Sequence, residues 1–484
     1  MKPNNRIGQL FFSRAFLLEA LVVALGGLIY GAFIVRSGAA AVGLTAGLLL
    51  FLVLSRSPVK ALALLLMVVP FSGMELFSEP IVDLPGARPF LLLGAFVAVI
   101  VFLNLDKATR MPRLGAVIAS VLVLFFALAV ARALPNKDAI GFAAGQEWSN
   151  FGFILSLFVK PLIYLMPLII AGKFIRDADD IEFLIKTIVA SVSVFSAYFM
   201  YYYIFQVKDK GNIEAAWEYV GEALGLHKNQ AASIYTLCFP ILLARYFARK
   251  DKLSLLGIAL SLPSIGFMYS RTTYVAVVVA VPLYLAFSKR SRFVPVLVIA
   301  GALLSFAVSE TIVERASTGL AEGDLGQISS GRVEGQWIPI VEEYLADPQK
   351  LLFGQGSNAV LVSEAYQKGL IAGGANHPHN MYLELIIDAG LLALIPMLLL
   401  YGILLKNTRV GLRTVHDPTL REYQCGAFVS MITYFIGGMT QGSFFPTIAG
   451  SYFWTMAAIS LLMTKIDMDL QQKTAIDVNS GTEQ

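Results

Sequence analysis

Long apolar runs separated by short polar segments form the main pattern of this 484-residue chain. An α-helix needs about 17–25 mostly apolar residues to cross the roughly 30 Å hydrocarbon core of a membrane. Runs of about this length lie at about residues 15–35, 38–54, 59–77, 89–105, 114–134, 151–172, 181–207, 229–248, 253–269, 272–288, 293–309, 381–405, 424–445 and 447–464. The pattern predicts an all-α polytopic membrane protein with about 12–14 transmembrane helices.

Composition agrees with this class and excludes others. Hydrophobic residues make up 57% of the chain and charged residues 14%, far from the averages of soluble domains. The formal net charge of +4 is small, and basic residues are scattered over short loops, which argues against nucleic-acid binding. Cys238 and Cys425 both lie in apolar runs, so we expect neither a disulfide framework nor a thiolate metal site. The lipid bilayer is the first partner that the sequence implies.

Lys and Arg are distributed unevenly between alternate loops, and this predicts the orientation. If the N-terminus is cytoplasmic, the inside loops hold about twice as many of these residues as the outside loops. The first apolar run is longer than the usual core of a signal peptide, so we expect a retained anchor. Both termini are then cytoplasmic, and the polar tail at 466–484 is expected to be disordered.

One external segment, at about residues 310–380, is long enough to carry function. It contains the run RVEGQWIPIVEEYLADP, in which apolar residues at helical spacing predict an amphipathic helix along the outer membrane interface. These apolar residues are Val333, Trp337, Ile340, Val341 and Tyr344. Pro339 is expected to kink the helix and Asp347–Pro348 to end it. The following LLFGQGSN predicts a tight turn in preference to a phosphate-binding loop.

The stretch ANHPHNMYLELIIDAG, residues 375–390, holds two of the four histidines of the chain where the external segment re-enters the membrane. Asn376 or His377 is expected to cap a helix that begins at Pro378, which places His379 in the first turn. The positive end of the helix dipole disfavours imidazolium there. His379 would therefore stay neutral and able to accept a proton, and His377 is the alternative base.

Polar residues four apart continue this stretch on one helix face, namely Asn380, Glu384 and Asp388. Carboxylates at membrane depth usually face a bundle interior or a watery cavity. We therefore expect His377, Asn380 and Glu384 to contact the substrate. Two other interpretations stay open: a histidine that only caps or lies at the interface, and a metal site, which lacks a third ligand at convincing spacing.

Arginines on the external side are the second sign of a site. Arg271 separates the runs at 253–269 and 272–288, so it is held at or just below the outer membrane surface, where a cation needs a compensating anion. Arg332 opens the predicted amphipathic helix. Because guanidinium groups bind phosphate in a bidentate manner, these arginines suit a lipid diphosphate headgroup. Further cations that could join them are Arg88, Arg132 and Lys160. The alternative is snorkelling or pairing with loop carboxylates.

These motifs resemble those of the bacterial O-antigen ligase and polymerase superfamily. HNMYLELIIDAG, from His379 to Gly390, looks like the histidine signature of that family. YSRTTYVA around Arg271, SGRVEGQW and LLFGQGSN occur in the order of the family pattern. The resemblance covers about residues 229–460. We divide the chain into N-terminal membrane helices (1–228), an O-antigen ligase-like membrane region with its large loop (229–465) and the tail (466–484).

The resemblance implies a GT-C-like membrane glycosyltransferase that takes a glycan from undecaprenyl diphosphate on the periplasmic side of the bacterial inner membrane. The acceptor would be lipid A–core in a ligase, or a second lipid-linked glycan in an O-antigen or exopolysaccharide polymerase. The family's histidine corresponds to His379, and its paired arginines correspond to Arg271 and Arg332. Ligases often have leucine where this chain has Val275, and their usual twelve spans are fewer than those counted here, so ligase and polymerase both stay open.

The expected reaction is an inverting transfer without metal or other cofactor. The external loops contain no Asp-x-Asp pair, and the diphosphate is already an activated leaving group. The rival hypothesis is a flippase or exporter of lipid-linked oligosaccharides, which many spans and a cationic cavity would also suit. Such transporters usually have two related halves and short external loops, unlike this chain.

Overall fold

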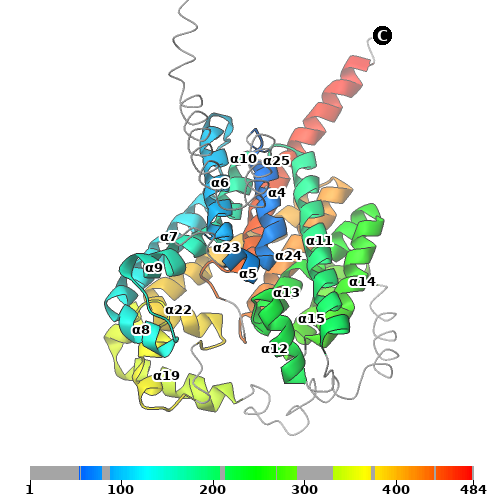
Figure 1. The fold of residues 1–484 in the computed structure, drawn as a ribbon. Helices are drawn as coiled ribbons and strands as arrows, with labels where there is room; N and C mark the ends of the chain where they lie inside the picture. Colours follow the sequence, from blue (N-terminus) through cyan, green and yellow to red (C-terminus); the bar gives the residue numbers. More distant parts are fainter. Residues whose placement is uncertain are drawn as a thin grey trace, which may run out of the picture.

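A computed structural model describes residues 54, 56–78, 88–207, 213–268, 270–291, 331–371, 377–440 and 443–481 of the chain. Every regular element within these residues is a helix (Figure 1). The expected spans at 15–35 and 293–309, and nearly all of the one at 38–54, lie outside the described residues. The all-α fold predicted from the apolar pattern is confirmed.

The described α-helices before the large loop are α4 (Pro58–Val68), α5 (Glu75–Ser78), α6 (Pro89–Leu103), α7 (Arg113–Ala133), α8 (Lys137–Ala143), α9 (Asn150–Ile154), α10 (Lys160–Phe174), α11 (Ala178–Tyr201), α12 (Ile213–Leu224), α13 (Lys228–Arg249), α14 (Lys252–Phe267) and α15 (Arg271–Phe287). The loop and the helices after it comprise η7 (Val333–Trp337), α19 (Ile338–Ala346), α20 (Pro348–Phe353), η8 (Ala359–Val362), α21 (Glu364–Gln367), α22 (Met381–Ala389), α23 (Leu391–Thr414), α24 (Pro418–Gly437) and α25 (Ile448–Gly481).

Several helical stretches in the described part are long and apolar enough to cross a membrane. Among the described residues, five stretches meet both conditions: Arg113–Ala143, Asn150–Phe174, Ala178–Gln206, Lys228–Arg249 and Leu391–Thr414. Shorter apolar helices lie at Pro58–Phe71, Pro89–Leu103, Lys252–Phe267 and Thr273–Phe287. The chain is a multi-pass membrane protein. The total of about 12–14 spans, the GT-C-like arrangement and the orientation stay predictions.

Helices α13 and α24 pack along each other at the centre of the bundle. Ser430 Oγ donates to the carbonyl of Leu237 (2.6 Å). A Cβ on Gly426 would lie 2.6 Å from the Cβ of Ala244, so only glycine allows this approach. Small residues and hydroxyl groups commonly hold helices together in lipid, where apolar burial gives little net attraction between them. This contact fixes the start of α13 beside the end of α24.

Charged residues gather at the end of the bundle where α13 finishes and α24 begins. Arg245 pairs with Glu182 of α11 and with Asp251, the cap of α14 (2.7 Å). Arg249 also pairs with Glu182 (3.2 Å), and the Tyr423 hydroxyl donates to the same carboxylate. We call these five residues the ion-pair end. Their charges are satisfied within the chain and connect four helices.

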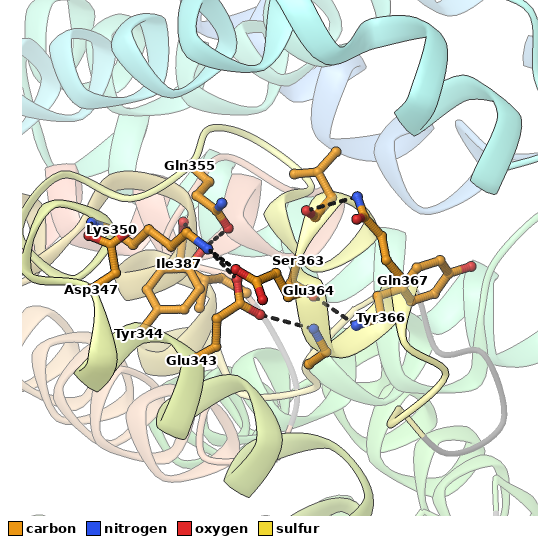
Figure 2. Close-up of polar contacts among 12 residues, drawn as sticks. Glu343, Tyr344, Asp347, Lys350, Gln355, Ser363, Glu364, Tyr366, Gln367 and Ile387 are labelled. Carbon is orange, nitrogen blue, oxygen red and sulfur yellow. Dashed lines mark hydrogen bonds and ion pairs between the residues drawn. The ribbon is translucent and has the colours of Figure 1, made fainter.

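The loop after residue 331 folds into a small core of its own, separate from the main bundle core. It contains the buried residues Ile340, Tyr344, Ala359, Val360, Ala365, Ile371, Leu383 and Ile387. The Tyr344 hydroxyl lies 2.8 Å from Gln355 Oε1 and 3.0 Å from the carbonyl of Ile387 (Figure 2). Lys350 Nζ donates to Glu343 Oε1 (2.8 Å), whose second oxygen accepts the amide of Ala365.

The predicted amphipathic helix is therefore present, and Asp347–Pro348 ends it as expected. Its buried side, with Ile340 and Tyr344, packs against the loop and α22. Val341, also placed on the apolar face, is 39% exposed, and the position of this helix along the membrane interface stays a prediction. The helix begins with the π-turn η7 ahead of Pro339, which lacks a backbone N–H to continue the ordinary pattern.

The apolar run at 381–405 is two helices, so its prediction as one span is wrong. Gly390 has φ +80° between α22 and α23, and a Cβ there would lie 2.1 Å from the carbonyl oxygen of Leu352. Glycine allows both this conformation and the approach of α20. The break places α22 with the loop core, and α23 alone has the length of a membrane span.

Helix α25 continues to Gly481, which corrects the predicted disordered tail over residues 466–481. The start of this extension is anchored, since Ile466 and Asp467 are buried. The Asp467 carboxylate accepts the backbone amides of His416 (3.0 Å) and Asp417 (2.8 Å). The C-terminal part of α25 points away from the end of the bundle where α19 and α22 lie (Figure 1).

Candidate functional site

The residues 377–380, here called the histidine strap, lead into α22 in a conformation that the sequence did not predict. Asn380 is the N-cap: its Oδ1 accepts the amides of Tyr382 (3.0 Å) and Leu383 (3.1 Å). His379 precedes the cap and has φ +53°. The expected helix start at Pro378, with His379 in the first turn, is therefore wrong; Asn376 lies outside the described residues. Asparagine is the better cap because its short side chain reaches the first free amides.

His377 connects the strap to the first turn of α22. Its Nδ1 accepts the backbone N–H of His379 (2.8 Å), and its Nε2 lies 3.1 Å from Glu384 Oε1. Since Nδ1 is an acceptor, the proton of neutral His377 lies on Nε2 and is donated to Glu384. Glu384 Oε2 is buried and has no hydrogen-bond partner among the described residues.

The loop holds the strap from the other side. Trp337 Nε1 donates to the carbonyl of Pro378 (2.7 Å), between the two histidines. Five residues earlier, Arg332 donates to the carbonyl of Thr440 (3.0 Å), in the connection between α24 and α25. The turn η7 thus joins the strap to the end of α24, whose Gly438 carbonyl accepts the amide of Met381 (2.8 Å).

The start of α13 contributes residues that the sequence analysis missed. Asn229 Nδ2 lies 3.4 Å from His379 Nδ1, and the rings of His227 and His379 are 6.0 Å apart, centre to centre. The rings of His377 and His379 are 5.3 Å apart. Three of the four histidines of the chain therefore meet at one place. The sequence HKNQ at the start of an apolar run was the available signal, but nothing local indicated which distant segment it would face.

Burial and neighbouring charges together decide the protonation of these imidazoles. Burial is the largest cause that lowers the pKa of His379, to about 3. The charges of Arg332, the two neighbouring histidines and Lys228 act in the same direction. Burial, followed by Lys228 and Arg332, also lowers the pKa of His227. Burial acts in the same direction on His377, but the Glu384 carboxylate outweighs it and raises the pKa of His377. His379 is accordingly neutral at physiological pH, as the sequence analysis expected, although the main cause is burial rather than a helix dipole.

The other cations singled out in the sequence have different surroundings. Arg271 begins α15 and is half-buried. Arg88 precedes α6, near enough to Lys160 for their like charges to interact. Arg132 donates to the carbonyls of Phe353 (2.6 Å) and Gly354 (2.9 Å), at the end of α20. Arg132 therefore attaches the loop to α7.

The glycine-rich stretch LLFGQGSN is a turn, as expected. Its amides at Gln355 and Gly356 donate to the carbonyls of Ile387 (2.8 Å) and Asp388 (3.0 Å). The Asp388 carboxylate accepts the amide of Ala359 (3.1 Å), which orders the turn against α22. These amides stabilise the loop and do not form a phosphate cradle. In the described part of the chain, no group of three or more histidine, cysteine and acidic residues has the geometry of a metal site.

Comparison with known families gives the arrangement a context. Residues 256–398 match the family model described as O-antigen ligase. The matched region contains Arg271, Arg332 and the histidine strap, and it ends in α23. A search of curated proteins found no match. The resemblance inferred from the motifs is thus confirmed over residues 256–398, which match an O-antigen ligase domain and support the O-antigen ligase and polymerase superfamily.

Proposed function

We propose that this protein is a glycosyltransferase that moves a glycan from undecaprenyl diphosphate to an acceptor on the periplasmic side of the bacterial inner membrane. The acceptor is lipid A–core in a ligase, or another lipid-linked glycan in an O-antigen or exopolysaccharide polymerase. The observation that carries the proposal is the grouping of His379 with two other histidines, whose rings lie 6.0 and 5.3 Å away, near cations inside an O-antigen ligase domain.

An anionic donor suits this site electrostatically. Arg332 and Lys228 lie near enough to His379 and His227 to lower the pKa of both imidazoles. A diphosphate bound to Arg332, and to Arg271 as the family resemblance implies, would offset these cations. The pKa of His379 would then rise toward the range of an effective base when the donor is bound.

The proposed reaction is a direct displacement. The acceptor hydroxyl oxygen attacks the anomeric carbon, the bond from that carbon to the phosphate oxygen breaks, and the hydroxyl proton passes to the ring of His379. Undecaprenyl diphosphate leaves with the bonding electrons, and the arginines stabilise the charge that develops on it. Attack opposite to the leaving group inverts the anomeric centre. The balance needs no metal or other cofactor.

Asn380 and Glu384 complete the proposed substrate site, and His377 lies beside them. Asn380 uses its Oδ1 as a helix cap, so only its amide nitrogen can donate to a substrate. Glu384 Oε2 is a buried acceptor that a sugar hydroxyl could satisfy. His377 has both ring nitrogens engaged, which favours His379 over His377 as the base.

The test is transfer by the purified protein in detergent, with an undecaprenyl-diphosphate-linked glycan as donor and either lipid A–core or a second lipid-linked glycan as acceptor. His379→Ala should lower transfer by about 10²–10⁴-fold, the usual contribution of a general base. His416→Ala is the matched control, because His416 contacts Asp467 at the other end of the bundle.

Product on lipid A–core would identify a ligase, and longer lipid-linked chains would identify a polymerase. Absence of product with every native donor and acceptor pair would reject the glycosyltransferase and favour the flippase. Full activity of His379→Ala would reject the assignment of the base while leaving the transfer itself established.

A further inference from the structure

The backbone of the histidine strap is held in an uncommon conformation. His379 has φ +53°, in the left-handed region that few non-glycine residues adopt. Such a conformation persists when neighbouring contacts impose it, and it is often found at functional sites. The contacts that could impose it here are those of His377, Trp337 and Asn380.

His377 makes the most direct of these contacts. Its Nδ1 accepts the N–H of the residue two positions later, His379 (2.8 Å), which is the hydrogen bond of an Asx-turn made by a histidine instead of an asparagine. Its Nε2 donates to Glu384 (3.1 Å), one turn into α22. The ring is thereby fixed at both nitrogens, and the backbone of His379 is fixed with it.

We propose that His377 is a positioning residue which, supported by Glu384, holds His379 in its left-handed conformation and releases it when His377 takes up a proton. Protonation puts a hydrogen on Nδ1, where it faces the N–H of His379, so the bond between them is lost. This role deepens the proposed function, on which its activity readout rests, and it differs from direct contact of His377 with the substrate.

The charges facing His377 set the pH at which release occurs. Glu384 lies on α22, Arg332 begins the turn η7, and His227 and His379 come from α13 and the strap. The Glu384 carboxylate outweighs burial and Arg332, so the pKa of His377 is raised above its ordinary value of about 6.5. The side chain is 36% exposed and can exchange protons with solvent. Release therefore begins near neutral pH and is half complete above about pH 6.5.

Three substitutions separate positioning from other roles. His377→Asn keeps an acceptor for the N–H of His379 and cannot be protonated in this range, so it should retain transfer within about tenfold and lose the acid sensitivity. His377→Phe keeps a ring without an acceptor, and a misplaced base should lower transfer by about 10²-fold. Glu384→Gln keeps an acceptor for Nε2–H but removes the charge, so loss of activity in acid should begin at lower pH than in the native protein.

The measurement is the rate of transfer between pH 5 and 8, together with thermal unfolding of each variant in detergent. Equal activity of His377→Phe and His377→Asn would overturn the proposal. So would a folded His377→Asn as inactive as His377→Phe, because that result assigns His377 a chemical role. If the rate of transfer fell at the same pH in the native protein and in Glu384→Gln, the protonation step would be overturned.

A second readout does not depend on transfer. The chain has four histidines, so ¹⁵N-histidine labelling gives few signals, and the signal that disappears in His377→Asn belongs to His377. It should show the proton on Nε2 at pH 8 and a midpoint above about 6.5 that Glu384→Gln lowers. A proton on Nδ1 at pH 8 would overturn the proposal. If no transfer is found with any donor, these signals still decide the role of His377 in the strap.

Discussion

The two ends of the bundle use charge in opposite ways. At the ion-pair end, Arg245 and Arg249 share the carboxylate of Glu182, and Asp251 completes the group. Glu422, the residue before Tyr423 in α24, pairs with Arg290 and accepts a hydrogen bond from the hydroxyl of Tyr284. Positive and negative groups balance there, and their contacts connect helices.

At the end where α13 begins, Arg332 and Lys228 lie near the imidazoles of the three clustered histidines. Arg332 and Lys228 lower the pKa of His379 and His227, and Glu384 compensates mainly His377. Cations grouped around neutral imidazoles in this way suit an anionic ligand. The comparison teaches that the paired charges of the ion-pair end serve assembly, whereas the cations grouped with imidazoles are the better candidate for substrate binding.

The largest expected effect is on catalysis at the histidine end. Arg332→Gln should lower transfer by about 10²–10³-fold, because it removes a donor to the charge that develops on the diphosphate. Arg249→Gln at the ion-pair end is the matched control: its side chain is 46% exposed, so transfer should stay close to the native rate. If Arg332→Gln and Arg249→Gln lost transfer activity equally, the proposed functional difference between the histidine end and the ion-pair end would be rejected.

The ion-pair end should respond in stability instead. Arg245→Met leaves Glu182 and Asp251 without their shared partner, and removing one member of a buried pair costs about 3–5 kcal/mol. The carboxylates left behind are 23% and 29% exposed, and Glu182 keeps Arg249, so solvent and this partner offset part of that cost. The thermal midpoint in detergent should fall sharply, whereas turnover per folded molecule should not. Loss of turnover without loss of stability would give the ion-pair end a functional role.

A smaller effect is expected at the joint that places α22 in the site. Gly390→Ala puts a methyl group against the Leu352 carbonyl at φ +80°, so it should destabilise the protein by more than about 1 kcal/mol and lower transfer. Gly402 lies in α23 with no atom near its would-be Cβ, and Gly402→Ala should stabilise by about 0.5–1 kcal/mol. Unchanged stability and transfer in Gly390→Ala would mean that the connection between α22 and α23 can rearrange to accept the methyl group.

The last prediction concerns the pH dependence of stability. The pKa of His379 is about 3 in the folded chain and about 6.5 when unfolded. Between these values the unfolded state binds a proton that the folded state does not, so the contribution of His379 is complete above pH 6.5 and is lost as the pH falls toward 3. Arg332→Gln should raise the pKa of His379 in the folded protein and so narrow the pH range over which stability is lost. Titration of the ¹⁵N-labelled histidines measures this pKa. If the pKa of His379 were the same in Arg332→Gln as in the native protein, Arg332 would have no electrostatic influence on His379.

Local sequence patterns determined much of this protein. Apolar runs of membrane length gave the all-α multi-pass class, and short ordered motifs gave the family. The end of α19 at Asp347–Pro348 and the turn in LLFGQGSN also followed, because proline and glycine restrict or free the backbone wherever they stand. The neutral state of His379 was anticipated, but its cause was misassigned.

Only the tertiary structure decided which segments meet. The start of α13 lies 150 residues before His379 in the chain, and their contact depends on the packing of α13 along α24 and of the loop on α22. The break at Gly390 depends on the close approach of α20. The helix beyond Ile466 depends on the Asp467 carboxylate, which accepts backbone amides of the turn between α23 and α24. Periodicity reports which face of a helix is apolar. It carries no information on which partner covers that face, because many partners bury apolar area equally well.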